Sequence, residues 1–329
     1  MVLYLVSVYD LSVSVNSIYH QIMNQPLWIL TGPTASGKSD VAFHVARAMG
    51  AEIISADSMQ VYRGMDIGTA KPSSEARAGV PHHLIDVVEP SESYSVGRFV
   101  RDAQQVITDV EQRGGRHLVT GGTGLYIKAL REGLFSGPEA DWALREELMA
   151  VAEEKGSAYL HNILKDADPG GAARINDGDL RRIVRALEVH QKTGRAISLL
   201  QREWGRHGGE SSLIVLYRSK SDLHRRIEQR VDKMLEQGLV EETQRLLSHP
   251  KGSLGKQARE ALGYKEVIEY LDGKLSADQM RDNIKQHTRR FAKRQMTWFR
   301  SFPRAIWMVI NEGEDTKSVS KRVQRVLER

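Results

Sequence analysis

The chain has 329 residues, a net charge of +5 and no cysteine. The missing cysteine excludes a disulfide scaffold, thiolate metal sites and a cysteine nucleophile, and it fits a cytoplasmic protein. Hydrophobic residues make up 40% and charged residues 27% of the chain, as in ordinary globular proteins, so a chain of this length is expected to fold as two units.

Residues 1–24 form an apolar, β-branched extension that is interrupted by Asp10 and several serines. The extension lacks the basic leading segment and the cleavage site of a secretory signal, and it is too short and too polar to span a bilayer. We expect a dispensable appendage, with translation beginning at Met23. No other segment is a membrane candidate, so we expect a cytoplasmic protein without a membrane partner.

The next stretch fits the phosphate-binding loop pattern, in which two glycines precede Lys and Ser at fixed spacing. An apolar run at residues 27–30 comes before it and apolar residues at helical spacing follow, which predicts a strand, a loop and a helix. Backbone N–H groups and the helix N-terminus would face an anion, Lys38 adds a mobile charge, and the Ser39 hydroxyl could ligate Mg²⁺. The predicted diphosphate- or nucleotide-binding residues are Gly32, Pro33, Thr34, Ala35, Ser36, Gly37, Lys38 and Ser39.

A second predicted strand, at residues 51–55, places Asp57 and Ser58 just beyond its carboxyl end. Ligands of open α/β sheets lie at that edge, so Asp57 could face the ligand of the first loop, although it could instead cap the next helix. A loop punctuated by glycine and proline follows at residues 64–72. Its Lys71 could reach a phosphate or could simply be solvated.

The pattern then predicts a strand, a helix and a strand, at residues 82–88, 99–112 and 116–120. His82 and His83 would point to opposite faces of their strand, so we discount a metal site there. The last of these strands ends in a Gly-rich turn at residues 121–126. This turn would expose backbone amides and the hydroxyl of Thr123 at the same edge of the sheet as the first loop.

Strand patterns vanish after residue 140 and charged helical patterns replace them, with breaks at residues 168–171 and Gly194. We therefore predict an all-helical insertion domain at residues 141–209. It separates the first part of the α/β core, at residues 25–140, from the second part, at residues 210–329.

Arginines gather on one side of a predicted helix in the insertion, where Arg181, Arg182 and Arg185 fall within a narrow arc. The opposite side carries Ile183, Val184 and Leu187. This positive stripe could contact an anion or nucleic acid, or it could be an ordinary solvated face.

A strand is predicted again at residues 213–217, and a long helix follows it. Arg226 and Arg230 lie one turn apart on that helix. Such a pair suits phosphate clamping because the guanidinium fork binds planar anions in bidentate fashion. Glu228 in the same helix is the competing partner.

The last informative segment is a basic helix at residues 288–300. Its positive residues share one arc and are Arg289, Arg290, Lys293, Arg294 and Arg300. Its aromatic residues are predicted to pack on the core from the facing arc and are Phe291, Trp298, Phe299 and Phe302. A face with five positive charges and no acid is typical of a polyanion site, so we favour nucleic acid over solvent here.

These residues together predict a P-loop NTPase-like α/β fold, with a parallel sheet flanked by helices and an all-helical insertion. Three functions fit: a small-molecule kinase, an NTP-driven nucleic-acid motor, and a group transferase with a pyrophosphate-bearing donor and a nucleic-acid acceptor. The motor is disfavoured because residues 118–120 lead into glycines rather than a Mg²⁺-binding Asp. The two basic stripes favour the transferase over the kinase.

The chain resembles the tRNA dimethylallyltransferase family, also called tRNA isopentenyltransferases, in its bacterial form. The matching stretches are residues 32–39, 54–62, 64–72, 121–130, 182–189, 226–230 and 292–299. The match at residues 64–72 is the most specific, because a generic phosphate-loop protein has no reason to share it. The resemblance implies transfer of dimethylallyl from dimethylallyl diphosphate to tRNA at the anticodon stem-loop. The acceptor would be the exocyclic amine of the adenosine 3′-adjacent to the anticodon, in tRNAs that read codons beginning with U.

Carried over by motif position, the resemblance implies catalytic roles for three residues. Asp57 would be the general base on the adenine amine, Thr123 would lie beside the adenosine, and Arg230 would contact the diphosphate with Lys38 and Mg²⁺. The implied tRNA contacts are Asp57, Ser58, Met59, Gln60, Thr123, Arg145, Arg181, Arg182, Ile183, Val184 and Arg185, to which the basic helix adds Arg290 and Arg294. The family commonly has Gln where Arg181 stands, and it has no counterpart of the N-terminal extension. Without cysteine, the zinc finger of eukaryotic relatives cannot form.

Overall fold

The computed structural model describes residues 26–134, 137–138, 140–201, 211–249 and 252–328. The N-terminal extension predicted at residues 1–24 lies outside the described residues. Within them the chain divides into two compact units, a helical unit from residue 132 to 201 and a core unit formed by residues 26–131 and 211–328.

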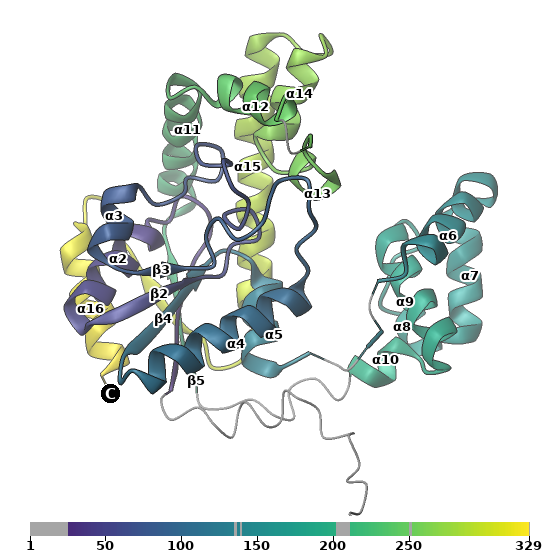
Figure 1. Ribbon diagram of the computed structural model, residues 1–329, viewed down its shortest axis with the longest axis horizontal. Helices are drawn as coiled ribbons and strands as arrows, with labels where there is room; N and C mark the ends of the chain where they lie inside the picture. Colours follow the sequence, from purple (N-terminus) through teal and green to yellow (C-terminus); the bar gives the residue numbers. More distant parts are fainter. Residues whose placement is uncertain (1–25, 135–136, 139, 202–210, 250–251, 329) are drawn as a thin grey trace, which may run out of the picture. The chain divides into compact units, whose positions relative to one another are not determined.

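A six-stranded parallel sheet forms the centre of the core unit, with strand order β3-β2-β4-β1-β5-β6 (Figure 1). The strands are β1 (Leu27–Thr31), β2 (Ala51–Ser55), β3 (His82–His83), β4 (Arg116–Gly121), β5 (Ser211–Tyr217) and β6 (Ile306–Val309). Strands β1, β2 and β4 are almost fully buried, which is why they read as continuous apolar runs. The predicted fold class is confirmed.

Helices cover both faces of this sheet. On one face, α2 (Lys38–Met49) packs beside α16 (Thr316–Leu327), and their apolar residues join those of the strands in one buried cluster (Figure 1). On the other face lie α4 (Val96–Gln112) and α5 (Gly124–Glu132), whose Phe99 and Tyr126 rings stack with centroids 4.2 Å apart. The sheet edge at which β1, β2 and β4 end therefore stays free for loops.

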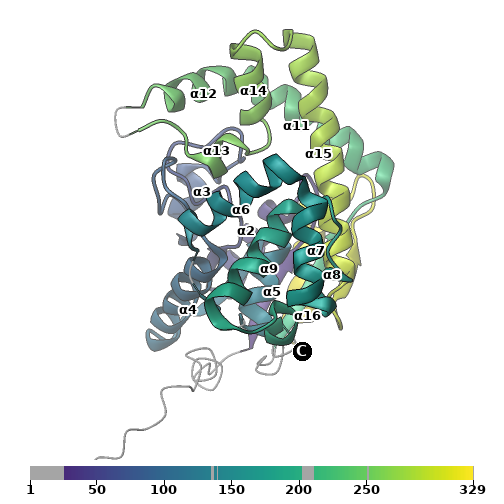
Figure 2. The same ribbon diagram turned by 90° about the vertical axis from the view of Figure 1, so that its right-hand side faces the viewer.

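Most of the remaining helices of the core unit lie between β5 and β6 in the sequence. These are α11 (Lys220–Glu236), α12 (Leu239–Leu247), α13 (Lys256–Arg259), α14 (Tyr264–Leu271) and α15 (Ala277–Arg300), whereas the short α3 (Ser74–Gly79) lies between β2 and β3. The long helices α11 and α15 lie side by side (Figure 1 and Figure 2). α15 begins with a capping box in which Ser276 and Gln279 satisfy each other's backbone N–H groups.

The helical unit contains α6 (Trp142–Lys155), α7 (Ser157–Ala167), α8 (Pro169–Ala172), α9 (Leu180–Thr193) and α10 (Ile197–Leu200). Its own apolar core includes Leu160, Ile183 and Leu187. The buried Asp168 carboxylate marks the break after α7, because it accepts the N–H groups of Gly171 and Ser198 at 2.7 and 2.8 Å. The first helix predicted for the insertion begins at Trp142, whereas the division between the units falls at Glu132.

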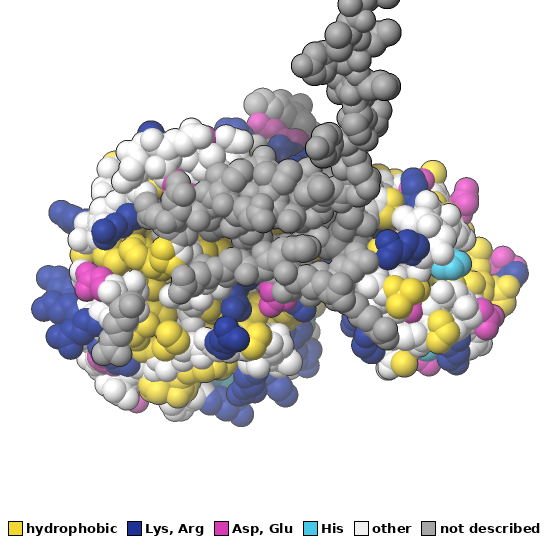
Figure 3. Space-filling model, turned by 90° about the horizontal axis from the view of Figure 1, so that it is seen from below, with side chains coloured by type: hydrophobic (Ala, Val, Ile, Leu, Met, Phe, Trp, Pro, Cys, Tyr) yellow, Lys and Arg dark blue, Asp and Glu magenta, His cyan; other side chains and the backbone are white. Residues whose placement is uncertain are grey.

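Two strands differ from the sequence prediction. The strand predicted at residues 82–88 has only two residues, because Leu84 and Asp86 adopt φ values of 61° and 56° that no strand can contain. Strand β6 was not predicted. Among the described residues no helix is long and apolar enough to cross a membrane. On the face seen in Figure 3, Lys and Arg side chains lie at the edge of the core unit and around its hydrophobic side chains.

Candidate functional site

The phosphate-binding loop connects β1 to α2 as its pattern predicts. A side chain at Gly32 would meet the carbonyl oxygen of Leu216 at 2.5 Å, and Gly37 adopts a φ of 90° at the start of α2. Both glycines are therefore required by the path of the chain. The loop ends on a helix N-terminus, which supplies free N–H groups and positive potential for an anion.

Two arginines hold the loop from its carbonyl side. The Nε of Arg226 donates to the carbonyl oxygen of Ala35 at 2.9 Å, and the Nε of Arg218 donates to that of Ser36 at 2.8 Å. Arg218 is itself paired with Asp222 at 2.9 Å. The predicted Arg226–Arg230 phosphate clamp therefore does not act as a pair, because Arg226 donates to the backbone of the loop. Arg218 was not predicted as a site residue, because it belongs to no recognisable motif.

Lys38, Arg230 and Asp57 interact electrostatically at the carboxyl edge of the sheet. Burial lowers the pKa of Lys38 to about 8, with Asp57 opposing the shift and Arg230 adding to it. Burial likewise lowers the pKa of Arg230, and Asp57 again acts in the opposite direction. Two partly desolvated cations beside one carboxylate leave a net positive site. Such a site suits a diphosphate.

The residues after β2 and β4 meet at the same edge. The Thr123 hydroxyl oxygen accepts the Ser58 N–H at 3.0 Å, and the Thr123 N–H donates to the Ala56 carbonyl oxygen at 3.2 Å. The Asp57 carboxylate accepts the N–H of Met59 through Oδ1 at 2.9 Å, so it does stabilise the local turn. Within the described residues its Oδ2 atom has no hydrogen-bond partner. That oxygen remains available to take a proton.

Gln60 has a structural role that the sequence did not reveal. Its Oε1 atom accepts the Ser55 hydroxyl at 3.0 Å, and its Nε2 atom donates to the carbonyl oxygen of Thr69 at 3.3 Å. The side chain therefore ties the start of the Asp57 segment to the loop at residues 64–72.

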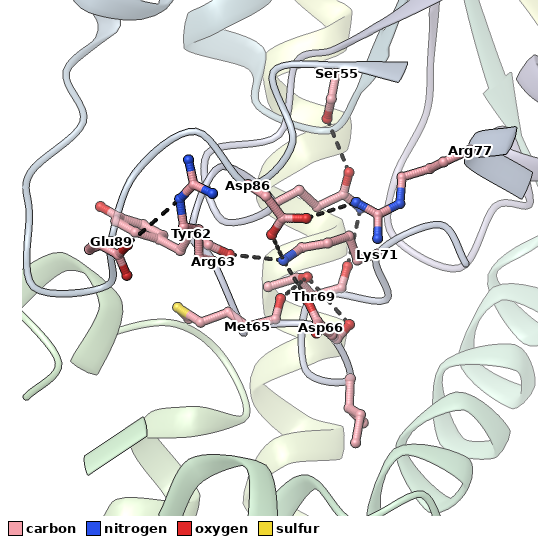
Figure 4. A network of polar contacts seen from close by, with 12 residues as sticks. Ser55, Tyr62, Arg63, Met65, Asp66, Thr69, Lys71, Arg77, Asp86 and Glu89 are labelled. Carbon is pink, nitrogen blue, oxygen red and sulfur yellow. Dashed lines mark hydrogen bonds and ion pairs between the residues drawn. The ribbon is translucent and has the colours of Figure 1, made fainter. Parts of the chain in front are cut away.

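The loop at residues 64–72 is organised around Lys71 (Figure 4). Only 2% of the Lys71 side chain is exposed, and its ammonium pairs with Asp66 at 2.5 Å and Asp86 at 2.6 Å and donates to the Tyr62 carbonyl oxygen at 2.8 Å. Burial would raise the pKa of Asp86, but Lys71 and Arg77 together hold it below its usual value. Both alternatives considered for Lys71, a phosphate contact and a solvated surface residue, are wrong.

Glu242 of α12 holds the same loop from the other side. Its buried carboxylate accepts the backbone N–H groups of Asp66, Ile67 and Gly68, at 3.2, 2.9 and 3.3 Å, and the hydroxyl of Tyr264 at 2.6 Å. A side chain at Gly68 would meet the Tyr264 ring at 2.4 Å. These contacts give a physical reason for the specific sequence of this loop.

The basic helix is part of α15, and two predictions about it are wrong. Phe299 and Phe302 are buried, but Phe291 and Trp298 are 36% and 39% exposed, so the aromatic arc does not pack wholly on the core. The basic face is also not free of acids, because Arg289 pairs with Glu228 at 3.0 Å. The exposed cations are Arg290, Lys293, Arg294 and Arg300, and the Arg294 guanidinium lies 5.8 Å from the Phe291 ring centroid.

In the helical unit, the arginines are less free than their pattern indicates. The buried Glu188 carboxylate forms a bidentate pair with Arg145, at 2.9 Å for each bond, and also pairs with Arg185. Burial acts to raise the pKa of Glu188, but these arginines lower it. Arg182 lies 3.8 Å from Asp179, while Arg181 is exposed with no ion pair among the described residues.

Ile183 and Val184 are buried in the core of the helical unit, with 0% and 5% of their surface exposed. Their side chains stabilise α9. They hold the arginines of this helix in place and present no surface to a ligand.

The metal-binding prediction rests on Ser39, which is exposed in the first turn of α2. His83 pairs with Glu52 at 2.6 Å, and the Nδ1 of His82 lies 2.7 Å from the Val80 carbonyl oxygen. The described residues contain no group of three or more His, Cys, Asp or Glu that could hold a metal ion. A divalent ion here would take its other ligands from the phosphates of a substrate and from water.

The fold and site define an α/β protein with a phosphate-binding loop and a carboxylate at one sheet edge. A family model described as IPP transferase matches residues 60–302, and one described as Isopentenyl transferase matches residues 25–86. The chain belongs to the IPP transferase family, which confirms the resemblance drawn from the motifs.

Proteins named tRNA dimethylallyltransferase are similar over nearly the whole chain. The one from Carboxydothermus hydrogenoformans is 47% identical and covers 93% of this chain and 97% of its own. The solved tRNA isopentenylpyrophosphate transferase of Bacillus halodurans is 38% identical, with a TM-score of 0.67 over 92% of this chain and 97% of its own. A eukaryotic dimethylallyltransferase, solved acting on tRNA, is 27% identical with a TM-score of 0.74, over 91% of this chain and 78% of its own.

Proposed function

We propose that the chain transfers the dimethylallyl group of dimethylallyl diphosphate to tRNA and releases diphosphate. The acceptor is the exocyclic amine of the adenosine 3′-adjacent to the anticodon, in tRNAs that read codons beginning with U. The observation that carries the proposal is the convergence of Lys38, Arg230 and Asp57 at one edge of the sheet. The names of the similar proteins support the same reaction.

Loss of diphosphate is the first requirement of the reaction. As the bond between the allylic carbon and the diphosphate oxygen breaks, negative charge grows on the leaving group and positive charge spreads over the allyl fragment. Lys38, Arg230 and the loop amides stabilise that negative charge from fixed positions, so little reorganisation is needed during the reaction. The arginines on the Ala35 and Ser36 carbonyls keep the amides in place.

Mg²⁺ fits the oxygen donors of this site, which are the Ser39 hydroxyl and the diphosphate itself. When bound, the ion supplies further neutralisation of the leaving group. The single protein hydroxyl suits Mg²⁺, because that ion keeps several waters and binds through substrate phosphates.

Attack by the adenine amine requires a base, because the nitrogen lone pair is delocalised into the ring. Asp57 accepts the proton at its free Oδ2 atom as the new carbon–nitrogen bond forms. Such assistance contributes roughly 10²–10⁴-fold. Thr123 is hydrogen-bonded to Ser58, next to Asp57, and positions the adenosine. The adenosine must leave its base stack to enter the site.

The tRNA is held by positive surfaces on both units. Arg290 and Arg294 contact phosphates from the core unit, and Arg181 and Arg182 do so from the helical unit, with Arg145 oriented by Glu188. Met59 and Gln60 contribute to tRNA binding indirectly, by fixing the conformation of the segment that follows Asp57. The reaction takes place in the cytoplasm, where tRNA is the acceptor.

The test combines two donors with one variant. Purified protein is incubated with unmodified tRNA and either dimethylallyl diphosphate or ATP, and the products are analysed by mass spectrometry. We expect a gain of one dimethylallyl unit on tRNA with the diphosphate donor. Phosphorylation of a metabolite would support a kinase instead, and tRNA-stimulated ATP hydrolysis a motor.

Asp57→Asn should preserve tRNA affinity and lower the single-turnover rate by roughly 10²–10⁴-fold. Asp109→Asn is the matched control, because that carboxylate is exposed on α4 and accepts a hydrogen bond from Gln105 of the same helix, away from the site. An unchanged single-turnover rate in Asp57→Asn would remove Asp57 from the chemistry.

A further inference from the structure

Gln295 connects the two loops of the site from the buried side of α15. Its Oε1 atom accepts the backbone N–H of Thr34 in the phosphate-binding loop at 2.8 Å, and its Nε2 atom donates to the carbonyl oxygen of Gly122 at 2.9 Å. Thr34 offers only a donor and Gly122 only an acceptor, so the orientation of the amide is fixed by its partners. Only 5% of Gln295 is exposed.

The turn after β4 is shaped to receive this amide. A side chain at Gly122 would lie 2.3 Å from Nε2 of Gln295 and 3.7 Å from Nζ of Lys38, so the bridge is close to the cation of the loop. Gly121 is packed as closely on the other side, where an added side chain would meet the Ala56 carbonyl oxygen at 2.2 Å. The turn is therefore held between the end of β2 and α15.

Packing alone does not explain a glutamine here. The buried neighbours of Gln295 on α15 include Ala292 and Phe299, and an apolar side chain of similar size would complete that face. The amide differs from such a side chain in bonding both loops at once. The Thr31 hydroxyl also reaches the turn, at the Gly121 carbonyl oxygen, but from β1 rather than from inside the loop.

We propose that Gln295 is a positioning residue, which fixes the distance between the loop that holds the leaving diphosphate and the turn that carries Thr123. This role rests on the proposed function. In-line attack needs the acceptor amine and the allylic carbon at one spacing, and a displacement of about 1 Å can cost on the order of 10²-fold in rate. Arg290 and Arg294 lie on the exposed face of the same helix, so tRNA bound there would contact α15, the helix that carries Gln295.

Gln295→Met tests the role by removing both hydrogen bonds at nearly constant volume. We expect the single-turnover rate with both substrates saturating to fall about 10- to 100-fold, while KM for each substrate changes less than about threefold. Exchange of the Thr34 N–H with solvent should become faster. Gln286→Met, on the exposed face of α15, is the control and should match the wild type.

Gln295→Glu supplies a second readout. The carboxylate keeps an acceptor for Thr34, loses the donor for Gly122 and brings a negative charge near Lys38. The pH above which donor binding weakens should therefore rise, and an unchanged pH would contradict the placement of Gln295 beside Lys38.

A lower melting temperature with an unchanged rate per folded enzyme would overturn the positioning role. So would a rise in KM at constant rate, which indicates simple binding. Absence of dimethylallyl transfer by the wild type would overturn the proposed function and this role together. Transfer by the wild type at a rate that Gln295→Met leaves unchanged would overturn this role alone.

Discussion

Replacing Glu242 should loosen the loop at residues 64–72 and destabilise the core unit. In Glu242→Met the three loop N–H groups and the Tyr264 hydroxyl lose their acceptor. Each unpaired buried group costs about 1–3 kcal/mol, and the partial exposure of the loop lets water satisfy some of them, so we expect a loss of about 3 kcal/mol. For a unit of this size that corresponds to a fall in melting temperature of about 6–12 °C.

A graded series makes this reasoning testable. In Glu242→Gln the new amide can turn so that its oxygen still serves Asp66 and Ile67, and the cost should be about 1 kcal/mol. Glu241→Gln changes the same charge at an exposed neighbour and should have no measurable effect. Thermal unfolding followed by circular dichroism gives the melting temperature of each variant, which should be lowest for Glu242→Met and highest for Glu241→Gln. Equal melting temperatures for Glu242→Met and Glu241→Gln would refute the anchoring role.

Three further predictions concern charge. Because protonated Lys38 binds the donor and its pKa is about 8, KM for dimethylallyl diphosphate should rise about tenfold between pH 7 and pH 9, and Lys38→Arg should abolish that rise. Replacing Arg290 and Arg294 together by Ala should weaken tRNA binding and reduce its log–log salt slope by about 1.5, measured by filter binding. Burial lowers the pKa of His117 to about 4, so below about pH 6.5 the unfolded state binds a proton that the folded state does not. The free energy of unfolding should therefore fall by up to about 3 kcal/mol between pH 6.5 and pH 4. In urea titrations, His117→Leu should show a smaller fall over the same pH range.

Each of these has a contradicting outcome. A donor KM that is flat to pH 9 would remove the charge of Lys38 from binding. Lys321 and Arg325 are exposed, lie one turn apart on α16 and are the matched control for the basic helix. Equal salt slopes for the two double variants would make the α15 face ordinary surface. If His117→Leu lost as much stability as the wild type between pH 6.5 and pH 4, groups other than His117 would be responsible for that loss.

Strong local patterns in the sequence predicted most of the sheet. Strands β1, β2, β4 and β5 are buried apolar runs, which can be recognised from the local sequence alone. Strand β6 is an edge strand with three of four residues exposed, and it follows a long helix without a motif. The strand predicted at residues 82–88 is cut short because Leu84 and Asp86 have positive φ values, and the Asp86 carboxylate there pairs with the distant Lys71 and with Arg77.

The candidate site was predictable where one motif contains both partners. The loop glycines, Lys38 and Asp57 belong to short patterns whose geometry is local. Gln295, Arg218 and Glu242 act across more than 170 residues of sequence, since their partners are Thr34, Ser36 and the loop at residues 64–72. A single sequence contains no information on which distant backbone group a buried polar side chain satisfies. The same reason explains why the arginines near Glu188 appeared free.

The central claim is tested most directly by locating the modification on tRNA. A tRNA that reads codons beginning with U and a copy with the adenosine 3′ of the anticodon replaced by guanosine are each incubated with protein and dimethylallyl diphosphate. Nuclease fragments are then weighed by mass spectrometry. We predict one dimethylallyl unit on the anticodon fragment of the first tRNA and none on the second. Equal modification of both tRNAs, or of neither, would contradict the account.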